Sequence, residues 1–309
     1  MKKALVLGAS GGMGYSIVNE LSNRGIKVVA FARNKQKLES LFKADSNVVI
    51  NPGDVFNETE LEHAANDVDV IFQAINIPYA DWKSKLIPLN EHVISTAKKV
   101  SAKIAVVDNI YAYGRSNGEK IHETTPKNPH TKKGKLRLAM ERLYKNSDVP
   151  YLIAHFPDFY GPHAENAQLN YTIRQIIANK NAQFVGKQHI RREHIFTPDG
   201  AKAIIELALR NDSYGQSWNI PAYDVISGEE LIKLIREITG YTKKVGTVTK
   251  NKLRFIGLFN KQMREFVEIQ YLAEEPVVLS GEKYEEHIGP VPRTPYRDGL
   301  KHTIDSYTN

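Results

Sequence analysis

The chain has 309 residues, of which 41% are hydrophobic and 25% are charged, an ordinary composition for a globular protein. It contains no cysteine, which excludes disulfides, thiolate metal sites and a cysteine nucleophile. The formal net charge of +7 comes from scattered lysines and arginines, which indicates a solvated surface and argues against a nucleic-acid partner. No run approaches the roughly 18 apolar residues of a membrane span, so we expect no membrane partner and a cytoplasmic location.

The first half of the chain alternates short apolar runs with amphipathic stretches. Strands are predicted at 3–7, 27–31, 48–50, 68–72, 104–107 and 151–154. Helices are predicted after residue 14 and at 35–42, 58–65, 81–100 and 133–144. This alternation predicts an α/β fold with a doubly wound parallel (Rossmann) sheet, whose strands end at one edge where ligands bind.

After residue 160 the regular alternation stops. Helices are predicted at 168–178, 199–209, 228–239 and 253–271, with a short strand at 217–220. We therefore expect a dinucleotide-binding Rossmann domain over 1–160. A smaller C-terminal α/β substrate lobe is expected over 161–309, interleaved with the last strands of the main sheet.

A glycine-rich turn follows the first predicted strand. Gly8, Gly11 and Gly14 are spaced three residues apart, and a helix follows them. Free backbone N–H groups and the helix dipole make such a turn a pyrophosphate site. We expect Gly8 to turn the chain, Gly11 to admit the phosphates and Gly14 to let the helix approach the strand. The alternative is a glycine-rich loop without a ligand, but the apolar run at 27–31 completes a βαβ unit and favours a dinucleotide.

The end of the second predicted strand distinguishes NAD from NADP. An acidic residue about 20 residues after the turn would accept hydrogen bonds from the ribose 2′-OH of NAD. The chain instead has Arg33 between Ala32 and Asn34, with no carboxylate. Because a guanidinium pairs with a phosphate and stacks on adenine, we predict NADP, with NAD as the alternative. Arg33 as an ordinary surface residue is the other interpretation.

Separate blocks, in order and at matching spacing, resemble the extended short-chain dehydrogenase/reductase family of the NAD-dependent epimerase/dehydratase type. The blocks are 8–14, Gly53-Asp54-Val55, Ala74-Ile75-Asn76, Ala112-Tyr113-Gly114, 157–162 and 194–199. The resemblance implies that the Asp of the second block contacts adenine and that the third lies under the adenosine ribose. The cofactor-binding residues predicted from the turn, the second strand and the resemblance are Gly8, Ser10, Gly11, Gly12, Met13, Arg33, Asp54, Val55, Ala74, Asn76 and Pro157.

The reaction centre departs from the family pattern, which is a Ser or Thr with Tyr-x-x-x-Lys. In the family a glutamate follows the lysine by four residues, and Glu141 fits that position. This register puts Arg137 at the lysine and Lys133 at the tyrosine. The other register puts Lys135 at the lysine and Thr131 at the tyrosine. Neither register supplies a tyrosine, so the usual acid/base mechanism does not carry over.

The remaining candidates for catalysis lie after the fifth predicted strand and on the next helix. Asn109 stands at the Ser/Thr position, and Tyr111 follows it at the sheet edge, where its phenol replaces the missing tyrosine. Lys133 titrates if it is buried, although a solvated lysine in the first helical turn is the simpler interpretation. Asp108 is a further candidate acid or base. No spacing of histidines and carboxylates indicates a metal site.

Two functions fit these residues. The first is an NAD(P)-binding oxidoreductase or epimerase-like enzyme, NADP-preferring, acting on a small molecule such as a carbonyl compound or a nucleotide sugar. The second is a catalytically inactive protein that senses NADP(H), because an intact glycine-rich turn stands beside an altered reaction centre. The resemblance also implies a homodimer formed through the helices at 81–100 and 133–144.

Overall fold

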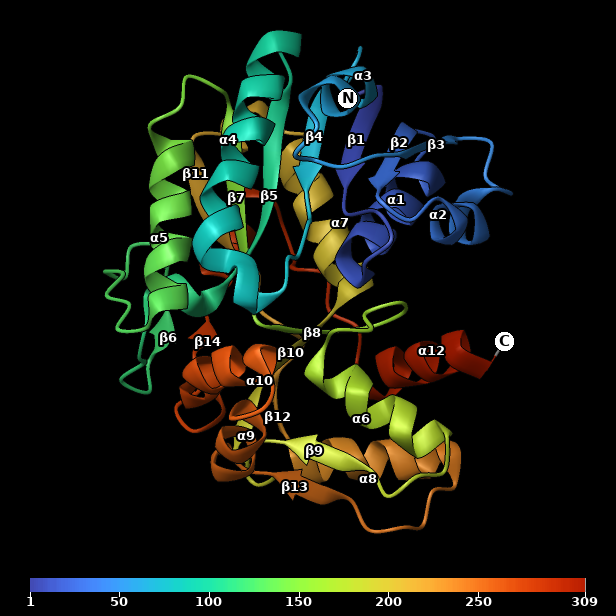
Figure 1. Cartoon of the computed structure of the whole chain (residues 1–309), viewed down its shortest axis with the longest axis vertical. Helices are drawn as coiled ribbons and strands as arrows, with labels where there is room; N and C mark the ends of the chain where they lie inside the picture. The colour runs from blue at the N-terminus through green and yellow to red at the C-terminus, as the bar shows by residue number, and fades with distance from the viewer. Residues whose placement is uncertain (309) are drawn as a thin grey trace.

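The computed structural model describes residues 1–308, and its centre is a seven-stranded sheet in which all neighbouring strands are parallel (Figure 1). The strand order is β11-β7-β5-β4-β1-β2-β3, so the chain winds outward from β1 in both directions. The strands are β1 (Lys3–Leu7), β2 (Lys27–Ala32), β3 (Val48–Pro52), β4 (Val70–Gln73), β5 (Lys103–Asn109), β7 (Tyr151–Phe156) and β11 (Gln216–Asn219). The predicted doubly wound parallel sheet is confirmed.

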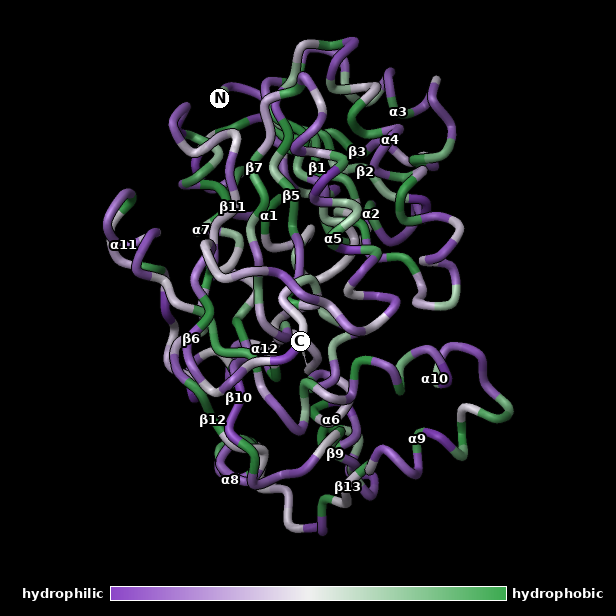
Figure 2. Tube along the Cα trace, turned by 90° about the vertical axis from the view of Figure 1, so that its left-hand side faces the viewer, coloured by the Kyte–Doolittle hydropathy of each residue, from purple (hydrophilic) through white to green (hydrophobic). Residues whose placement is uncertain are grey.

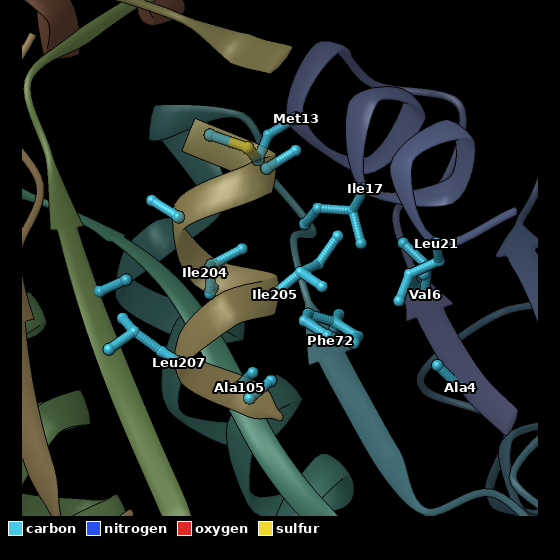
Figure 3. Close-up of a cluster of buried hydrophobic side chains, with 14 of the residues drawn as sticks. Ala4, Val6, Met13, Ile17, Leu21, Phe72, Ala105, Ile204, Ile205 and Leu207 are labelled. Carbon is cyan, nitrogen blue, oxygen red and sulfur yellow. The ribbon is translucent and has the colours of Figure 1, made fainter. Parts of the chain in front are cut away.

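Helices cover both faces of this sheet, because the central strands are apolar on both sides. One face is covered by α1 (Gly12–Asn23), α2 (Lys35–Phe42) and α7 (Thr197–Ala208), and the other by α3 (Glu58–Ala64), α4 (Trp82–Val100) and α5 (Lys132–Lys145). Figure 3 shows the first layer, where Ile17 of α1 lies near Ile205 of α7 above Phe72 of β4, and Leu21 and Ile204 belong to the same core. These five side chains are fully buried.

A smaller lobe lies beyond the carboxyl edge of the sheet, in the lower half of Figure 1. Its three-stranded sheet consists of β12 (Val225–Ser227), β10 (Arg191–Phe196) and β8 (Asp158–Tyr160), and a parallel pair consists of β9 (Gln183–Val185) and β13 (Gly246–Val248). A third hydrophobic core forms among α6 (Gln168–Ile177), α8 (Gly228–Thr239) and α12 (Tyr296–Thr308).

The chain passes between the two parts several times. After β10 of the lobe, α7 packs on α1, and β11 then adds to the edge of the main sheet beside β7. Later the pair of β6 (Lys120–Ile121) and β14 (Val278–Leu279) brings residues far apart in sequence together, and α11 (Glu282–His287) follows. The short 3₁₀ turns are η1 (Tyr79–Asp81), η2 (Ile110–Tyr113), η3 (Asn211–Ser213) and η4 (Val267–Ala273).

The prediction of one helix over 253–271 is wrong. The structure has α9 (Lys250–Gly257), a turn, α10 (Lys261–Phe266) and then η4. Asn260 starts the second helix because its Oδ1 accepts a hydrogen bond from Met263 N at 3.1 Å. Gly257 allows close packing of the two helices, since a Cβ there would lie 2.9 Å from Arg264 Cα. The result is a helical hairpin.

The stretch 108–130, for which no element was predicted from the sequence, contains η2 and the two-residue strand β6. Among residues 1–308 no helix combines the length and apolar character needed to cross a bilayer.

Candidate active site

The residues predicted from the sequence for cofactor binding lie along one edge of the main sheet. They follow the carboxyl ends of adjacent parallel strands, which is where ligands of such sheets bind. From β3 to β7 they are Asp54 and Val55, then Arg33, then the turn 8–13, then Ala74 and Asn76, and finally Pro157. The parallel registers align these strand ends, for example Leu7 beside both Phe31 and Gln73.

The glycine-rich turn is tight because its glycines lie against backbone. Gly8 has a φ of +79°, and a Cβ on it would lie 2.8 Å from the Ala74 carbonyl oxygen. A Cβ on Gly14 would lie 2.2 Å from the Gly8 carbonyl oxygen, so a side chain there would push α1 away from β1. At Gly11 the nearest atom would be 3.5 Å away, an ordinary contact.

The N-terminus of α1 suits an anion. Its N-cap residue is Gly11, and no side chain of the described residues caps the helix. The first N–H groups of an uncapped helix keep their donors free, and the helix dipole favours negative charge there. The Gly11 N–H donates to the Gly8 carbonyl oxygen at 3.0 Å. The turn therefore fits the pyrophosphate of a dinucleotide, which the backbone N–H groups of Ser10, Gly12 and Met13 would hold. The Met13 side chain turns away into the core, against Gly200.

A loop from the lobe lies over this turn. A Cβ on Gly12 would lie 2.6 Å from the Ala164 Cβ, which shows how closely the loop approaches. Lys37 of α2 forms an ion pair with Glu165 at 3.1 Å, and Tyr15 of α1 meets the His163 ring edge-on at 4.3 Å. Residues 163–165 thus bridge α1 and α2 across the candidate pyrophosphate position.

The end of the site that is predicted to bind adenosine carries an exposed arginine. Arg33 is exposed directly after β2, and it forms no ion pair with any of residues 1–308. The next residue, Asn34, is occupied as the cap of α2, since its Oδ1 accepts from Lys37 N at 2.9 Å. Asp54 accepts a hydrogen bond from Phe56 N at 3.1 Å, and Val55 is buried beneath it.

Two tyrosines meet at the other end of the edge. The Tyr111 and Tyr79 hydroxyls are 2.8 Å apart, and Tyr111 is only 6% exposed. Burial raises the pKa of Tyr79 to about 12 and the pKa of Tyr111 well above its usual range. Both phenols are therefore protonated near neutral pH. Asn109 stabilises this arrangement, since its Oδ1 accepts from Tyr111 N at 3.0 Å.

Arg137 supplies a permanent positive charge behind the two tyrosines. Its guanidinium lies 3.1 Å from Asp108 Oδ1 and 4.3 Å from the centre of the Trp82 ring. This charge favours the ionised phenolates and so opposes the effect of burial on the pKa of Tyr79 and Tyr111. The sequence comparison with the family places Arg137 at the lysine position, where a cation is also expected.

Lys133 is buried, at 2% exposure, but it does not reach the tyrosine hydroxyls. Its ammonium forms ion pairs with Glu265 at 2.6 Å and Glu268 at 3.0 Å. The nearest part of Tyr79 is its ring, whose centre is 5.6 Å from the Lys133 Nζ. The structure thus places Lys133 as the attachment point of the α10–η4 segment rather than beside the hydroxyl pair.

A buried charge cluster lies below the tyrosines. Ligand atoms of Asp108, Glu141 and His155 lie within 4.8 Å of one another, close enough in principle for a metal ion. The Lys127 ammonium, however, bonds to Glu141 and lies 2.9 Å from His155 Nε2. Burial raises the pKa of both carboxyls, and Lys127 and Arg137 oppose that shift. Because Lys127 already provides the cation, we assign no metal to this cluster.

Tyr79 and the two glutamates that hold Lys133 were not predicted from the sequence. Tyr79 lies in η1, in the segment that follows β4. A tyrosine near the end of a parallel strand is the signal that would have found it. Glu265 and Glu268 had no local signal, because they meet Lys133 only through the hairpin that replaced the predicted helix.

Comparison with known proteins identifies the family and the fold. A family model described as NAD(P)H-binding matches residues 8–194, more than half of the chain. The chain therefore belongs to this family, and its fold is that of the extended short-chain dehydrogenases/reductases. An uncharacterized oxidoreductase from Staphylococcus haemolyticus is 34% identical over 76 residues, which is 24% of this chain. The match spans only 33% of that relative's length.

Solved structures match over the whole chain. The dTDP-glucose 4,6-dehydratase from Bacillus anthracis, in complex with NAD, superposes with a TM-score of 0.81 at 19% identity, covering 100% of this chain and 97% of that one. The UDP-glucuronic acid 4-epimerase from Bacillus cereus, also with NAD, gives 0.79 at 18% identity, with 99% and 98% covered. The UDP-glucose 4-epimerase from Thermotoga maritima with UDP-glucose gives 0.78 at 17%, with 99% and 98% covered. At these identities the likeness establishes the fold alone.

Proposed function

We propose that the protein is an NADPH-dependent reductase of carbonyl compounds, in which Tyr111 donates the proton. The observation that supports this most is the Tyr111–Tyr79 hydroxyl pair, in which Tyr111 is buried and Tyr79 partly buried, in the segments that follow β5 and β4. Reduced nicotinamide bound along this edge would supply the hydride. Tyr111 would donate its proton to the carbonyl oxygen, Tyr79 would return one to Tyr111 through their hydrogen bond, and Tyr79, which is only partly buried, would regain its proton from solvent water.

The direction of reaction follows from the protonation of these phenols. Because burial raises the pKa of Tyr111, its phenol is protonated near neutral pH, so it carries a proton to donate and cannot accept one. Reduction of a carbonyl needs a donor, whereas epimerisation by transient oxidation begins with a base that removes a hydroxyl proton. The site therefore favours reduction over epimerisation, although the solved relatives include epimerases of nucleotide sugars.

The preference for NADP rests on Arg33. An exposed guanidinium after β2, with no acidic neighbour at the strand end, suits a 2′-phosphate. The solved relatives named above include NAD complexes, so a comparison of NADPH with NADH tests whether this chain differs from them. Titration with NADPH and NADH, followed by nicotinamide fluorescence, is expected to favour NADPH at least tenfold. Arg33→Ser would remove that preference, and Arg142→Ser, on the exposed side of α5, would retain it.

The lobe would bind the substrate in a crevice between it and the sheet. Its lining includes the charged pair Asp158 and Arg192, whose nearest atoms are 3.7 Å apart, and a second carboxyl, Glu193. The apolar residues are Ile110, Pro157, Leu272, Pro276 and Val277.

The function is tested by NADPH oxidation against a panel of aldehydes, ketones and nucleotide sugars. Tyr111→Phe is expected to lower kcat by about 100-fold or more, because general acid catalysis contributes that much. Tyr171→Phe, at an exposed position on α6, is the matched control. Tight NADPH binding without turnover of any compound would support the alternative, a protein that senses NADP(H).

We also propose a homodimer formed through α4 and α5 and a cytoplasmic location, where NADPH is made and used. Light scattering on the purified protein tests the first, and cell fractionation tests the second. A monomer at micromolar concentration would exclude a stable dimer of this kind.

A further inference from the structure

The α9–α10 hairpin carries an unusual concentration of exposed apolar side chains. Phe255, Leu258 and Phe259 are 67%, 71% and 84% exposed, and Ile256 is exposed as well. Phe255 and Phe259 meet edge-on with their ring centres 6.0 Å apart, so they form one patch. The other large exposed hydrophobic residues among 1–308 are scattered singly over the chain. A contiguous patch of this kind marks an interaction surface.

The same hairpin is strongly basic. Residues 250–264 contain five basic residues and no acidic one, so this short segment carries +5 of a net charge of +7. The basic residues are Lys250, Lys252, Arg254, Lys261 and Arg264. The only ion pair among them joins Lys250 and Glu274, at 3.8 Å, within the part of the chain that the structure describes. The charge is therefore available to an external anionic surface.

The inner side of the hairpin holds it to the body of the protein. Gln262 Oε1 accepts from Ala80 N at 3.2 Å, and Phe266 stacks on Tyr79 at 6.1 Å. Glu265 is paired with Lys133. One side of the hairpin is therefore attached to the body of the protein, and the apolar patch remains exposed to solvent. Figure 2 shows α9 and α10 projecting from the molecule, with hydrophobic colour at the outer end.

We propose that this hairpin seats on an anionic lipid bilayer, with its phenylalanines in the headgroup region and its basic residues against lipid phosphates. Aromatic side chains beside lysines and arginines are the combination that binds an anionic membrane surface. A second copy of this chain fits less well, because two hairpins of charge +5 repel each other. Such binding is peripheral, so it needs no spanning helix and is compatible with the finding that residues 1–308 contain none. It departs from the expectation, drawn from the sequence, of no membrane partner.

The test is flotation of the purified full chain with two kinds of vesicle, phosphatidylcholine alone and phosphatidylcholine with 30% phosphatidylglycerol. We expect binding to the anionic vesicles at least tenfold tighter than to the neutral ones, and weaker binding in high salt. Phe255→Ser with Phe259→Ser is expected to weaken binding at least tenfold. Val49→Ser with Leu209→Ser, two exposed apolar positions elsewhere, is the matched control and should bind as the wild type does.

A second pair of variants isolates the charge. Arg254→Glu with Lys261→Glu is expected to lose binding, whereas Lys187→Glu with Lys233→Glu makes the same change in net charge at exposed positions of the lobe and should retain it. Melting curves of each variant verify folding. Absence of vesicle binding by the wild type, or equal loss in both charge pairs, would overturn the proposal. A dimer that the serine variants split, without vesicle binding, would assign the patch to a second copy instead.

Discussion

At the scale of single residues, the glycine-rich turn was the most informative stretch of the sequence. The spacing of Gly8, Gly11 and Gly14 predicted a tight strand–turn–helix, and the structure has it. The tyrosine pair at the other end of the candidate site was harder to predict, because Tyr111 meets Tyr79 across 32 residues of chain. Which side chains meet at a sheet edge depends on loop conformations, and these leave no local pattern in the sequence.

Substitutions at two glycines of the turn are expected to differ, one lowering stability and the other weakening NADPH binding. Gly14→Ala places a Cβ against the Gly8 carbonyl, so we expect the free energy of unfolding to fall by about 2–3 kcal/mol, although alanine normally favours a helix. Gly11→Ala meets only an ordinary contact and should leave stability within about 1 kcal/mol while weakening NADPH binding. Urea unfolding and fluorescence titration of both variants measure this. Equal destabilisation by the two would contradict it.

At the scale of elements, the regular β–α alternation was predicted well and the lobe was predicted poorly. Strands such as β4 and β5 contain short continuous apolar runs, which their length and their alternation with amphipathic stretches identify. The strands β8, β9 and β12 are three residues long, too short to show a period. The break between α9 and α10 depends on the cap at Asn260 and the close contact at Gly257, which an amphipathic pattern continuous over 253–271 conceals.

The attachment of the α10–η4 segment should depend on Lys133. Lys133→Met removes both of its ion pairs, and the freed carboxylates of Glu265 and Glu268 are hydrated because they are partly exposed. We expect hydrogen exchange of the amides in 261–273 to speed up by about 5- to 30-fold, equivalent to about 1–2 kcal/mol. Lys98→Met, which removes an exposed pair with Asp148, should change exchange little. Unchanged exchange in 261–273 would show that apolar packing alone holds the segment.

At the scale of the whole molecule, a buried carboxylate ties the lobe to the main sheet. Glu193 of β10 accepts hydrogen bonds from Ala222 N at 2.9 Å, just after β11, and from Leu279 N of β14 at 2.8 Å. Burial raises the pKa of Glu193 to about 7, although the hydrogen bonds from these two N–H groups lower it. The folded protein therefore prefers this group protonated, whereas the unfolded chain ionises it at its ordinary pKa of 4.5.

The raised pKa of Glu193 predicts how the free energy of unfolding changes with pH. As the pH rises from 4.5 through about 7, the unfolded chain releases the Glu193 proton first, so this group's contribution to the free energy of unfolding declines. The slope is up to about 1.4 kcal/mol per pH unit. Glu193→Gln does not titrate, and so its stability relative to the wild type should rise across this window. Urea midpoints at pH 5, 6, 7 and 8 measure the difference, and parallel curves would refute it.

The position of β11 at the edge of the main sheet bears on how the chain is made. A ribosome synthesises β7 about sixty residues before β11, which takes about 3–12 s at ordinary elongation rates. During that interval Leu152, Ile153 and Ala154, fully buried in the finished protein, belong to an unpaired edge strand. The nascent chain therefore passes through a stage in which its central sheet is nearly complete and yet able to pair with a foreign strand, and it leaves this stage only after the first half of the lobe has been translated.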